Sequence, residues 1–326
     1  MSKLSSPAHR GFTVRGHLAF VLADVQTKKS WEFAEGAAIV PGRHAVELLG
    51  GGRRYEAYLA WDDRMHALVT VKLLRPHLVS DPGARNAIAG EAEALRALQH
   101  PALVRCFDAD LDGERPHLAL EFLDGPRLST LIRRHGIIVE QLLPLALELS
   151  AALHFIAARS FVHLDVKPKN VIMSAPPRLI DLSVATRLEH VADLASPTGT
   201  DAYMAPEQCD PALFGEIGPA SDVWGLGVTL YEAISGSLPF PEGDLTAAAS
   251  GARYPQLELE PRPLGRNVPA PVAELIQACL VKEPAQRPST LEVADIVEPW
   301  AARLPQARLG LFRPGGRVRR SIFEGR

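Results

Sequence analysis

Residues 161–173 read FVHLDVKPKNVIM and place three polar side chains of different chemistry close together, Asp165, Lys167 and Asn170. Apolar residues flank the group on both sides, and Pro168 stands between the lysine and the asparagine. Because proline resists helix formation, residues 163–170 are predicted to form a loop between a helix and a pair of strands. The stretch therefore brings a carboxylate, an ammonium and an amide into one loop.

A second carboxylate follows in the stretch PRLIDLS, where Asp181 ends a short apolar run. A hairpin that brought this carboxylate beside the Asn170 amide would supply the oxygen ligands that Mg²⁺ prefers when it carries phosphates. Asp165 would then accept a proton from a hydroxyl, and Lys167 would neutralise charge on a transferred phosphoryl group. These residues favour phosphoryl transfer; taken alone, they are equally compatible with a chance polar loop in a core connection.

The composition is that of an ordinary globular protein. The chain has 326 residues, 47% of them hydrophobic and 22% charged, which is enough for one large domain or two lobes. Its net charge of −3 predicts no overall affinity for nucleic acid or for a membrane surface. The cysteines, Cys106, Cys209 and Cys279, form no CxxC pattern, so neither a disulfide framework nor a zinc site is expected. We expect a cytoplasmic protein.

The most apolar segment, residues 137–158, is long enough to cross a bilayer. It contains Glu140, Pro144, Glu148 and His154, and carboxylates are costly in lipid. We therefore expect a buried helix of a globular core and no membrane span. Near the N-terminus a short apolar run lacks a small-residue cleavage site, so a secretory signal is not expected.

The chain changes from strand patterns to helix patterns along its length. Short strands are predicted at 12–25, 30–36 and 37–40. The alternating runs 44–51, 53–63 and 66–74 then predict a β-meander, and 84–99 has the spacing of an amphipathic helix. Two more strands are predicted on either side of a turn at 112–113. Long helical runs follow at 137–160, 220–236, 271–282 and 289–302. This order predicts an α+β protein of two lobes, with a hinge near 121–126.

Seven motifs occur in order between residues 45 and 300. They are VTVK (69–72), GEAEALRALQHPALV (90–104), HLDVKPKN (163–170), DLS (181–183), GTDAYMAPEQ (199–208), SDVWGLGVTLYEAISGSLPF (221–240) and RPS (287–289). In this order and spacing they resemble a eukaryotic-type Ser/Thr protein kinase of the kind that bacteria also carry. The resemblance implies a bilobal protein-kinase-like fold, with a β-rich small lobe that carries one regulatory helix and a helical large lobe.

The resemblance also implies an activity and a set of site residues. The protein would use ATP and Mg²⁺ to phosphorylate Ser or Thr hydroxyls of protein substrates. Asp165 would be the catalytic base, Lys167 and Thr200 would complete the catalytic group, and Asn170 and Asp181 would hold the metal. The implied nucleotide-binding residues are Leu49, Gly50, Gly52, Ala57, Lys72, Glu91, Glu121, Leu123 and Ile172.

Within this set each residue has an implied role. Glu91 would pair with Lys72 and hold its ammonium at the α- and β-phosphates, and the backbone of Glu121 and Leu123 would contact the adenine edge. Glu93 competes for the lysine but points away from the Glu91 face of the helix. Outside the cleft, Arg287 is expected to pair with Glu207, while Asp222 supports the catalytic loop.

Several positions depart from the kinase pattern. Tyr55 replaces the third glycine of the phosphate-binding loop, and Thr70 replaces a small residue above the adenine. Ser183 replaces the glycine of the metal-binding triplet, which should stiffen that hinge. The first two changes are expected to alter the nucleotide pocket and to lower its affinity.

Leu164 stands where many kinases carry an arginine before the catalytic aspartate. That arginine pairs with a phosphate on the activation loop and so orders the loop, whereas leucine cannot. We therefore predict that phosphorylation of Ser196 or Thr198 is not the main activating switch.

Two positive charges bear on substrate choice. Arg127 and Lys169 occupy positions where arginine-directed kinases often carry glutamate, although Glu232 is retained. We expect a substrate that is not basic and that is acidic near the target hydroxyl.

The predicted organisation has four parts: an N-terminal extension of unknown role (1–40), a small lobe (41–122), a large lobe (123–304) and a basic tail (305–326) with six arginines and one glutamate. The tail is interpreted as a solvated end or as a docking arm for an acidic partner. The alternatives to an active protein kinase are a pseudokinase scaffold and a small-molecule kinase. The sequence does not name the substrate, the activating signal or the oligomeric state.

Overall fold

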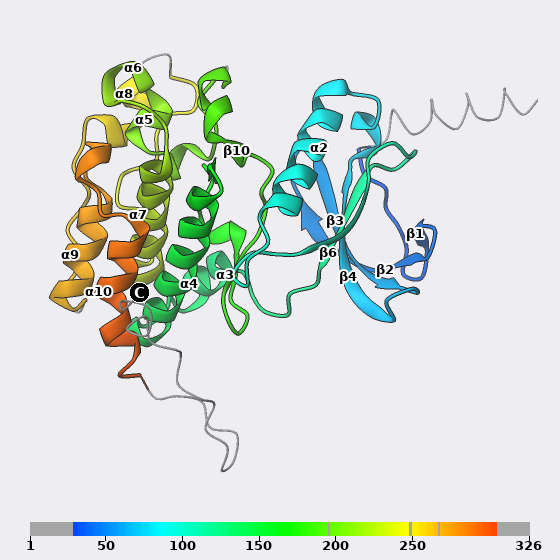
Figure 1. The fold of residues 1–326 in the computed structure, drawn as a ribbon, viewed down its shortest axis with the longest axis horizontal. Coiled ribbons are helices and arrows are strands. Elements are labelled where there is room, and N and C mark those ends of the chain that lie inside the picture. The colour runs from blue at the N-terminus through cyan, green and yellow to red at the C-terminus, as the bar shows by residue number, and fades with distance from the viewer. Residues whose placement is uncertain (1–28, 195, 248–249, 267, 305–326) are drawn as a thin grey trace, which may run out of the picture.

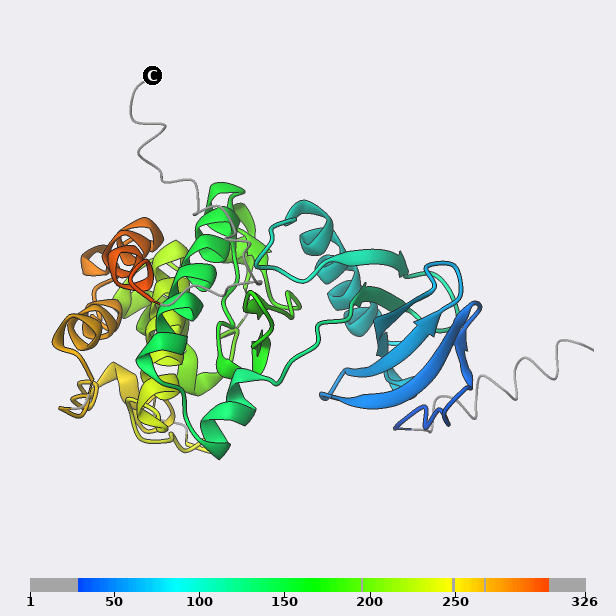
Figure 2. The same ribbon diagram turned by 90° about the horizontal axis from the view of Figure 1, so that it is seen from below.

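The computed structural model describes residues 29–194, 196–247, 250–266 and 268–304. They form two lobes, one built on a β-sheet and one built mainly of helices, as Figures 1 and 2 show. The sheet lobe comes first in the chain, and the connection that leaves it after Glu121 leads into the helical lobe. The predicted α+β fold of two lobes is confirmed.

The small lobe contains one antiparallel sheet in the order β1-β2-β3-β4-β6-β5. Its strands are β1 (Ala38–Val40), β2 (Arg43–Gly51), β3 (Tyr55–Asp62), β4 (Ala67–Leu74), β5 (Cys106–Asp110) and β6 (His117–Glu121). The alternation in β4 buries Val69, Val71 and Leu73 completely in a core on one face of the sheet. Lys72 therefore lies on the opposite face, opposite Ala57 of β3.

Helix α2 (Pro82–Ala97) packs against the face of the sheet that carries Lys72 (Figure 1). It begins after Asp81, whose carboxylate accepts a hydrogen bond from the Ala84 N–H at 2.7 Å and so caps the helix. Ile88, Ala92 and Leu95 form its buried stripe. Glu91 lies on the same buried side, so the helix directs a carboxylate toward the sheet.

The end of the N-terminal extension packs on the other face of the sheet. The predicted strand over 30–36 is wrong: this segment is irregular, and its Trp31 and Phe33 side chains pack against the core. Trp31 donates a hydrogen bond from Nε1 to the Leu74 carbonyl at 2.8 Å, and the Arg115 guanidinium lies over both rings. The sheet itself begins at Ala38, just inside the region assigned to the extension. The strand predicted over 12–25 lies outside the described residues.

The large lobe is mostly helical. Its helices are α3 (Leu128–Arg134), α4 (Val139–Ala158), α5 (Pro206–Cys209), α6 (Pro211–Phe214), α7 (Pro219–Ser235), α8 (Ser250–Arg253), α9 (Ala270–Cys279) and α10 (Thr290–Ala301). Short strands β7 (Phe161–Val162), β8 (Val171–Ile172), β9 (Arg178–Leu179) and β10 (Thr186–Arg187) lie on the side that faces the small lobe. Short 3₁₀ helices occur in this lobe at Pro168–Asn170, Leu188–Asp193, Asp201–Tyr203, Pro255–Leu257 and Pro284–Gln286, and in the small lobe at Pro76–Leu78.

Helix α4 is the one described helix that is long and apolar enough to cross a membrane by length and composition. In the structure it packs between α7 and α10. Leu145, Leu149, Ala152 and Ile156 are fully buried there. The predicted buried core helix is therefore confirmed.

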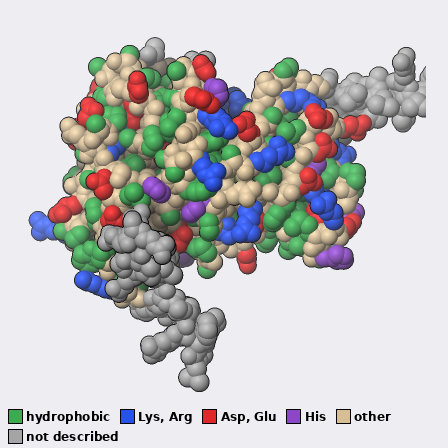
Figure 3. Space-filling model, in the orientation of Figure 1, with side chains coloured by type: hydrophobic (Ala, Val, Ile, Leu, Met, Phe, Trp, Pro, Cys, Tyr) green, Lys and Arg blue, Asp and Glu red, His purple; other side chains and the backbone are tan. Residues whose placement is uncertain are grey.

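On the face shown in Figure 3, acidic and basic side chains are interspersed over both lobes. The lobes are joined through residues 122–127, and Arg127 then forms a β-bridge with Ile172. The Glu121 carboxylate, at the end of β6, lies 3.4 Å from the Arg178 guanidinium of β9. The hinge is thus held at both ends by contacts with the strands of the large lobe.

Candidate active site

The polar loop 163–170 is held from below by Asp222 at the start of α7. The two carboxylate oxygens of Asp222 accept hydrogen bonds from the main-chain N–H groups of His163 and Leu164 at 2.8 and 2.7 Å. Burial raises the pKa of Asp222 to about 7, against the effect of these two bonds. Leu164 adopts a φ of +62°, an uncommon conformation for leucine, and the two bonds at this point fix the loop. The predicted loop and the supporting role of Asp222 are confirmed.

The structure brings Asp165, Lys167 and Thr200 into one hydrogen-bonded group. The Lys167 ammonium donates to Asp165 Oδ2 and to Thr200 Oγ1, each at 2.6 Å. The Thr200 hydroxyl in turn donates to Asp165 Oδ1 at 2.7 Å. Asn170 is buried and donates from Nδ2 to the Asp165 carbonyl and Oδ2 at 3.0 and 3.1 Å. The Asp165 carboxylate therefore has three neighbouring donors that fix its orientation.

Lys72 lies between two carboxylates from different elements. Its ammonium donates to Glu91 Oε1 of α2 at 2.7 Å and to Asp181 Oδ1 at 2.8 Å. Burial alone would lower the pKa of Lys72, but the two carboxylates raise it above its ordinary value, so the lysine stays charged. For Asp181, burial acts to raise the pKa and Lys72 more than offsets it, so the pKa lies well below the ordinary value. Glu93 points away, as predicted, and lies 3.2 Å from Arg187.

Asn170 and Asp181 are neighbours because of the hairpin that the sequence predicts. Strands β8 and β9 pair, and the Ile180 N–H donates to the Asn170 carbonyl at 2.8 Å. Both recorded hydrogen bonds of the Asn170 side chain use its nitrogen, so the amide oxygen remains for a metal ion. The described residues hold no cluster of three or more His, Cys, Asp or Glu side chains suited to a metal. The asparagine and aspartate oxygens nonetheless suit Mg²⁺ when phosphate oxygens complete its coordination.

The loop between β2 and β3 needs glycine at two positions, and only one of them was among the predicted residues. Gly50 has a φ of +137°, and a Cβ on Gly51 would lie 2.6 Å from the Tyr55 carbonyl. At Gly52 a Cβ would meet nothing within 4 Å, and its N–H already donates to the Tyr55 carbonyl at 3.0 Å. Sequence reasoning missed Gly51 because the close approach arises only when the hairpin closes.

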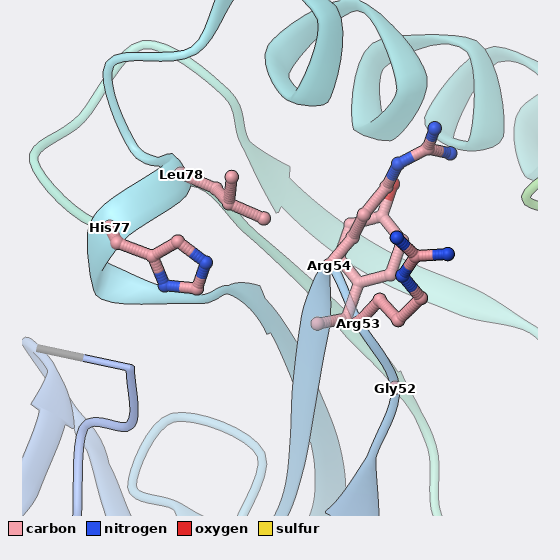
Figure 4. Close-up of a pocket in the computed structure, with 6 residues that line it drawn as sticks. Gly52, Arg53, Arg54, His77 and Leu78 are labelled. Carbon is pink, nitrogen blue, oxygen red and sulfur yellow. The ribbon is translucent and has the colours of Figure 1, made fainter.

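A hollow of about 660 Å³ lies at the tip of this loop, beside the 3₁₀ turn that follows β4 (Figure 4). It is lined by Gly52, Arg53, Arg54, Tyr55, His77 and Leu78. The hollow is therefore next to the expected phosphate position and does not include the predicted adenine residues.

The predicted adenine residues come from three segments. Ala57 pairs with Lys72 between β3 and β4, and Leu49, near the end of β2, is 38% exposed. The Glu121 N–H already donates to the Arg105 carbonyl at 2.9 Å, so a contact from Glu121 to the adenine edge would have to use its carbonyl. Leu123 is partly buried in the hinge that follows, and Ile172 lies in β8 below it. The fold thus places these residues along the boundary between the lobes.

Two buried contacts hold the segment that follows Asp181. Arg287 forms a two-pronged ion pair with Glu207, at 2.6 and 2.8 Å, which confirms the predicted pair. The Gln208 amide donates to the Thr198 and Leu164 carbonyls at 2.9 and 3.0 Å. Sequence reasoning did not assign a role to Gln208, and no local pattern marks an amide that bonds to distant carbonyls.

Comparisons with known proteins agree with this geometry. The model of the protein kinase domain matches residues 43–300. Serine/threonine-protein kinase PknA of Mycobacterium tuberculosis is 33% identical over 258 residues, which cover 76% of this chain and 58% of PknA. Serine/threonine-protein kinase PknB of the same organism is 30% identical over 274 residues, which cover 80% of this chain and 43% of PknB. The matched region thus spans about half the length of these relatives. The chain belongs to the protein kinase domain family.

Proposed function

We propose that this protein transfers the γ-phosphoryl group of ATP to Ser or Thr hydroxyls of protein substrates. The observation that carries the proposal is the group of Asp165, Lys167 and Thr200, whose three mutual distances are 2.6 to 2.7 Å. A carboxylate held in this way is oriented to accept the proton of a substrate hydroxyl. The relatives PknA and PknB are named as serine/threonine-protein kinases, which supports the same substrate class.

The other polar residues have separate tasks in this mechanism. Lys167 neutralises charge on the transferred group, and Lys72, held by Glu91, grips the nucleotide phosphates. Mg²⁺ would be held by Asn170 and Asp181 and would supply charge neutralisation between the phosphates. Release of Asp181 from Lys72 would free the carboxylate for the metal and the ammonium for phosphate.

The pseudokinase alternative gains no support from the site. Every polar side chain that the phosphoryl-transfer mechanism requires is present. Each forms a hydrogen bond with another residue of the site. Removal of one such group usually costs about 10²- to 10⁴-fold in rate. That cost is a reason to keep the arrangement in an active enzyme, whereas a scaffold has no rate to lose.

The test is the incorporation of radiolabelled phosphate from Mg²⁺-ATP into a generic protein acceptor. We expect label on Ser or Thr, and Asp165→Asn should lower the rate by about 10²- to 10⁴-fold. The matched control is Asp63→Asn, which changes an exposed aspartate 55% accessible at its side chain. Absence of label in the unaltered protein, or equal rates in both aspartate variants, would contradict the proposal.

We further propose a preference for acidic residues near the target hydroxyl. Arg127 donates from its guanidinium to the main-chain carbonyl of Lys169 at 2.6 Å, which places this cation beside the backbone that carries Lys169. The Glu232 carboxylate already accepts a hydrogen bond from the Tyr203 hydroxyl at 2.5 Å and interacts with the positive charge of Lys169, so it is less available to a basic peptide. A peptide array that selects arginine upstream of the acceptor would refute this preference. Arg127→Glu is expected to shift selection toward basic peptides.

A cytoplasmic location remains part of the proposal. All three cysteines are free thiols, as expected in a reducing compartment where ATP and Mg²⁺ are available. Cell fractionation followed by immunodetection would test it.

A further inference from the structure

The Tyr55 ring lies against the Lys72 ammonium. The distance from Lys72 Nζ to the ring centroid is 4.6 Å, within the range of a cation–π contact. The strand register explains why the two meet. Tyr55 pairs with Leu74, and Ala57 pairs with Lys72, so all four side chains project from the same face of the sheet. A residue at the position of the third loop glycine is thereby directed at the lysine.

Burial, rather than hydrogen bonding, holds the ring in place. The Tyr55 hydroxyl is buried and has no hydrogen-bond partner in the described part of the chain. Burial, reinforced by the negative charge of Glu91, raises the pKa of Tyr55 to about 12, so the phenol is neutral at physiological pH. The ring packs against the core that includes Leu74 and Ile88. A neutral, well-packed aromatic ring therefore covers part of the lysine surface.

The ammonium has few ways to contact another anion in this arrangement. A lysine has three N–H donors, and two of them are directed at Glu91 and Asp181. The side chain is only 12% exposed. A phosphate oxygen that approached Lys72 would compete with Asp181 on one side and with the Tyr55 ring on another. If Asp181 loses its contact with Lys72, its carboxylate can bind Mg²⁺ instead. The Tyr55 ring would lose its contact with the ammonium and gain no other cation.

We propose that Tyr55 is a nucleotide-gating residue, whose ring covers Lys72 and is displaced when the phosphates of ATP or ADP bind. The proposal rests on the proposed function, because it assumes that Lys72 contacts nucleotide phosphates. The free energy needed to move the ring lowers nucleotide affinity. The positions of Asp165, Lys167 and Thr200, which perform the transfer, do not change. Tyr55 thus raises the nucleotide concentration at which the enzyme works.

The test is calorimetric titration of Mg²⁺-ADP into the unaltered protein, Tyr55→Ala and Tyr55→Phe. Tyr55→Ala removes the ring and should tighten binding by about tenfold. Tyr55→Phe keeps the ring and should bind ADP like the unaltered protein. The control is Trp300→Ala, which removes a ring that lies 5.5 Å from Arg303 at the end of α10, and it should change nothing. In kinase assays Tyr55→Ala should lower KM for ATP and leave kcat within about twofold.

Different results separate this proposal from the one on which it rests. Equal ADP affinity in the unaltered protein and Tyr55→Ala would overturn the gate and leave the kinase function standing. Weaker binding by Tyr55→Phe would also overturn it, because the hydroxyl would then be a phosphate donor. If neither the unaltered protein nor any variant binds ADP, both the gating role of Tyr55 and the proposed kinase function are contradicted. If Tyr55→Ala does not fold, Tyr55→Leu keeps apolar packing without an aromatic face and should still bind ADP more tightly.

Discussion

The side-chain amide of Gln208 donates a hydrogen bond to the main-chain carbonyl of Leu164 at 3.0 Å. A second bond from the same nitrogen reaches the Thr198 carbonyl at 2.9 Å, and the amide oxygen accepts from the Ala205 N–H at 3.0 Å. One buried glutamine therefore links the catalytic loop to the segment that carries Thr200. Gly199 makes room for this link, since a Cβ there would lie 2.6 Å from the Leu164 carbonyl.

This link predicts an activation segment that does not depend on phosphorylation. Ser196→Ala with Thr198→Ala should keep activity within about twofold, whereas Gln208→Met should lower it by tenfold or more because two buried carbonyls lose their donor. Initial rates with saturating ATP would measure both. Gln277→Met, on the exposed side of α9, is the matched control. A near-total loss of activity in the double alanine variant would show that a phosphate orders the segment instead.

The sequence predicted those parts of the fold whose signals are local. The alternation of Val69, Val71 and Leu73 defines a strand by itself, and the helical spacing of Ile88, Ala92 and Leu95 defines α2. The order of the kinase motifs then carried the expectation that Lys72, Asp165, Asn170 and Asp181 gather in one cleft. These predictions needed no knowledge of how distant side chains pack.

The features that escaped prediction are contacts between distant segments. Trp31 bonds to the carbonyl of Leu74, and Gln208 bonds to that of Leu164, each across more than 40 residues of chain. A side chain that bonds to a backbone carbonyl leaves no signature, because every residue has one. The position of the Tyr55 ring likewise follows from the register of β3 against β4, which periodicity alone does not define.

The Thr200 hydroxyl is predicted to keep Asp165 and Lys167 in their productive positions. Thr200→Ala removes one donor to the carboxylate and one acceptor for the ammonium, at 2.7 and 2.6 Å. Because the bond from Lys167 to Asp165 remains, we expect a net loss worth about one hydrogen bond to a charged group, about 1.5–3 kcal/mol, so kcat should fall by roughly 10- to 100-fold. Thr200→Ser retains the hydroxyl and should restore most of the rate. If Thr200→Ser is as impaired as Thr200→Ala, the methyl group and its packing matter rather than the hydrogen bonds.

The buried pair of Arg287 and Glu207 is predicted to be essential for stability. Both side chains are fully buried, and the Ser221 hydroxyl adds a bond to Glu207 at 2.7 Å. Arg287→Ala leaves a carboxylate buried without its partner and should lower the free energy of unfolding by about 3–5 kcal/mol. Urea denaturation measures the loss. Arg187→Ala breaks the more exposed pair with Glu93 and should cost no more than about 1 kcal/mol. Equal losses in the two variants would contradict this account.

His163 is predicted to make stability depend on pH below neutrality. Its side chain is fully buried, and burial lowers its pKa below the ordinary 6.5. The ring accepts a hydrogen bond from the Asp165 N–H through Nδ1 at 3.2 Å, which requires the neutral form at that nitrogen. Between the lowered pKa and 6.5, the unfolded chain binds a proton that the folded chain does not. The contribution of His163 to stability is therefore full above pH 6.5 and falls as the pH decreases, by up to about 1.4 kcal/mol per pH unit.

The measurement is the free energy of unfolding between pH 7.5 and pH 5, about 1 unit above and about 1.5 units below the ordinary pKa of histidine. His163→Phe keeps a ring of similar size without a titrating group, so its stability should fall less steeply with acid. His100 and His117 also have lowered pKa values, and Asp222, with its raised pKa, contributes in the opposite direction. These groups are present in both proteins, so the difference between the two slopes isolates His163. Parallel slopes would show that the imidazole is protonated in the folded state as readily as in the unfolded chain.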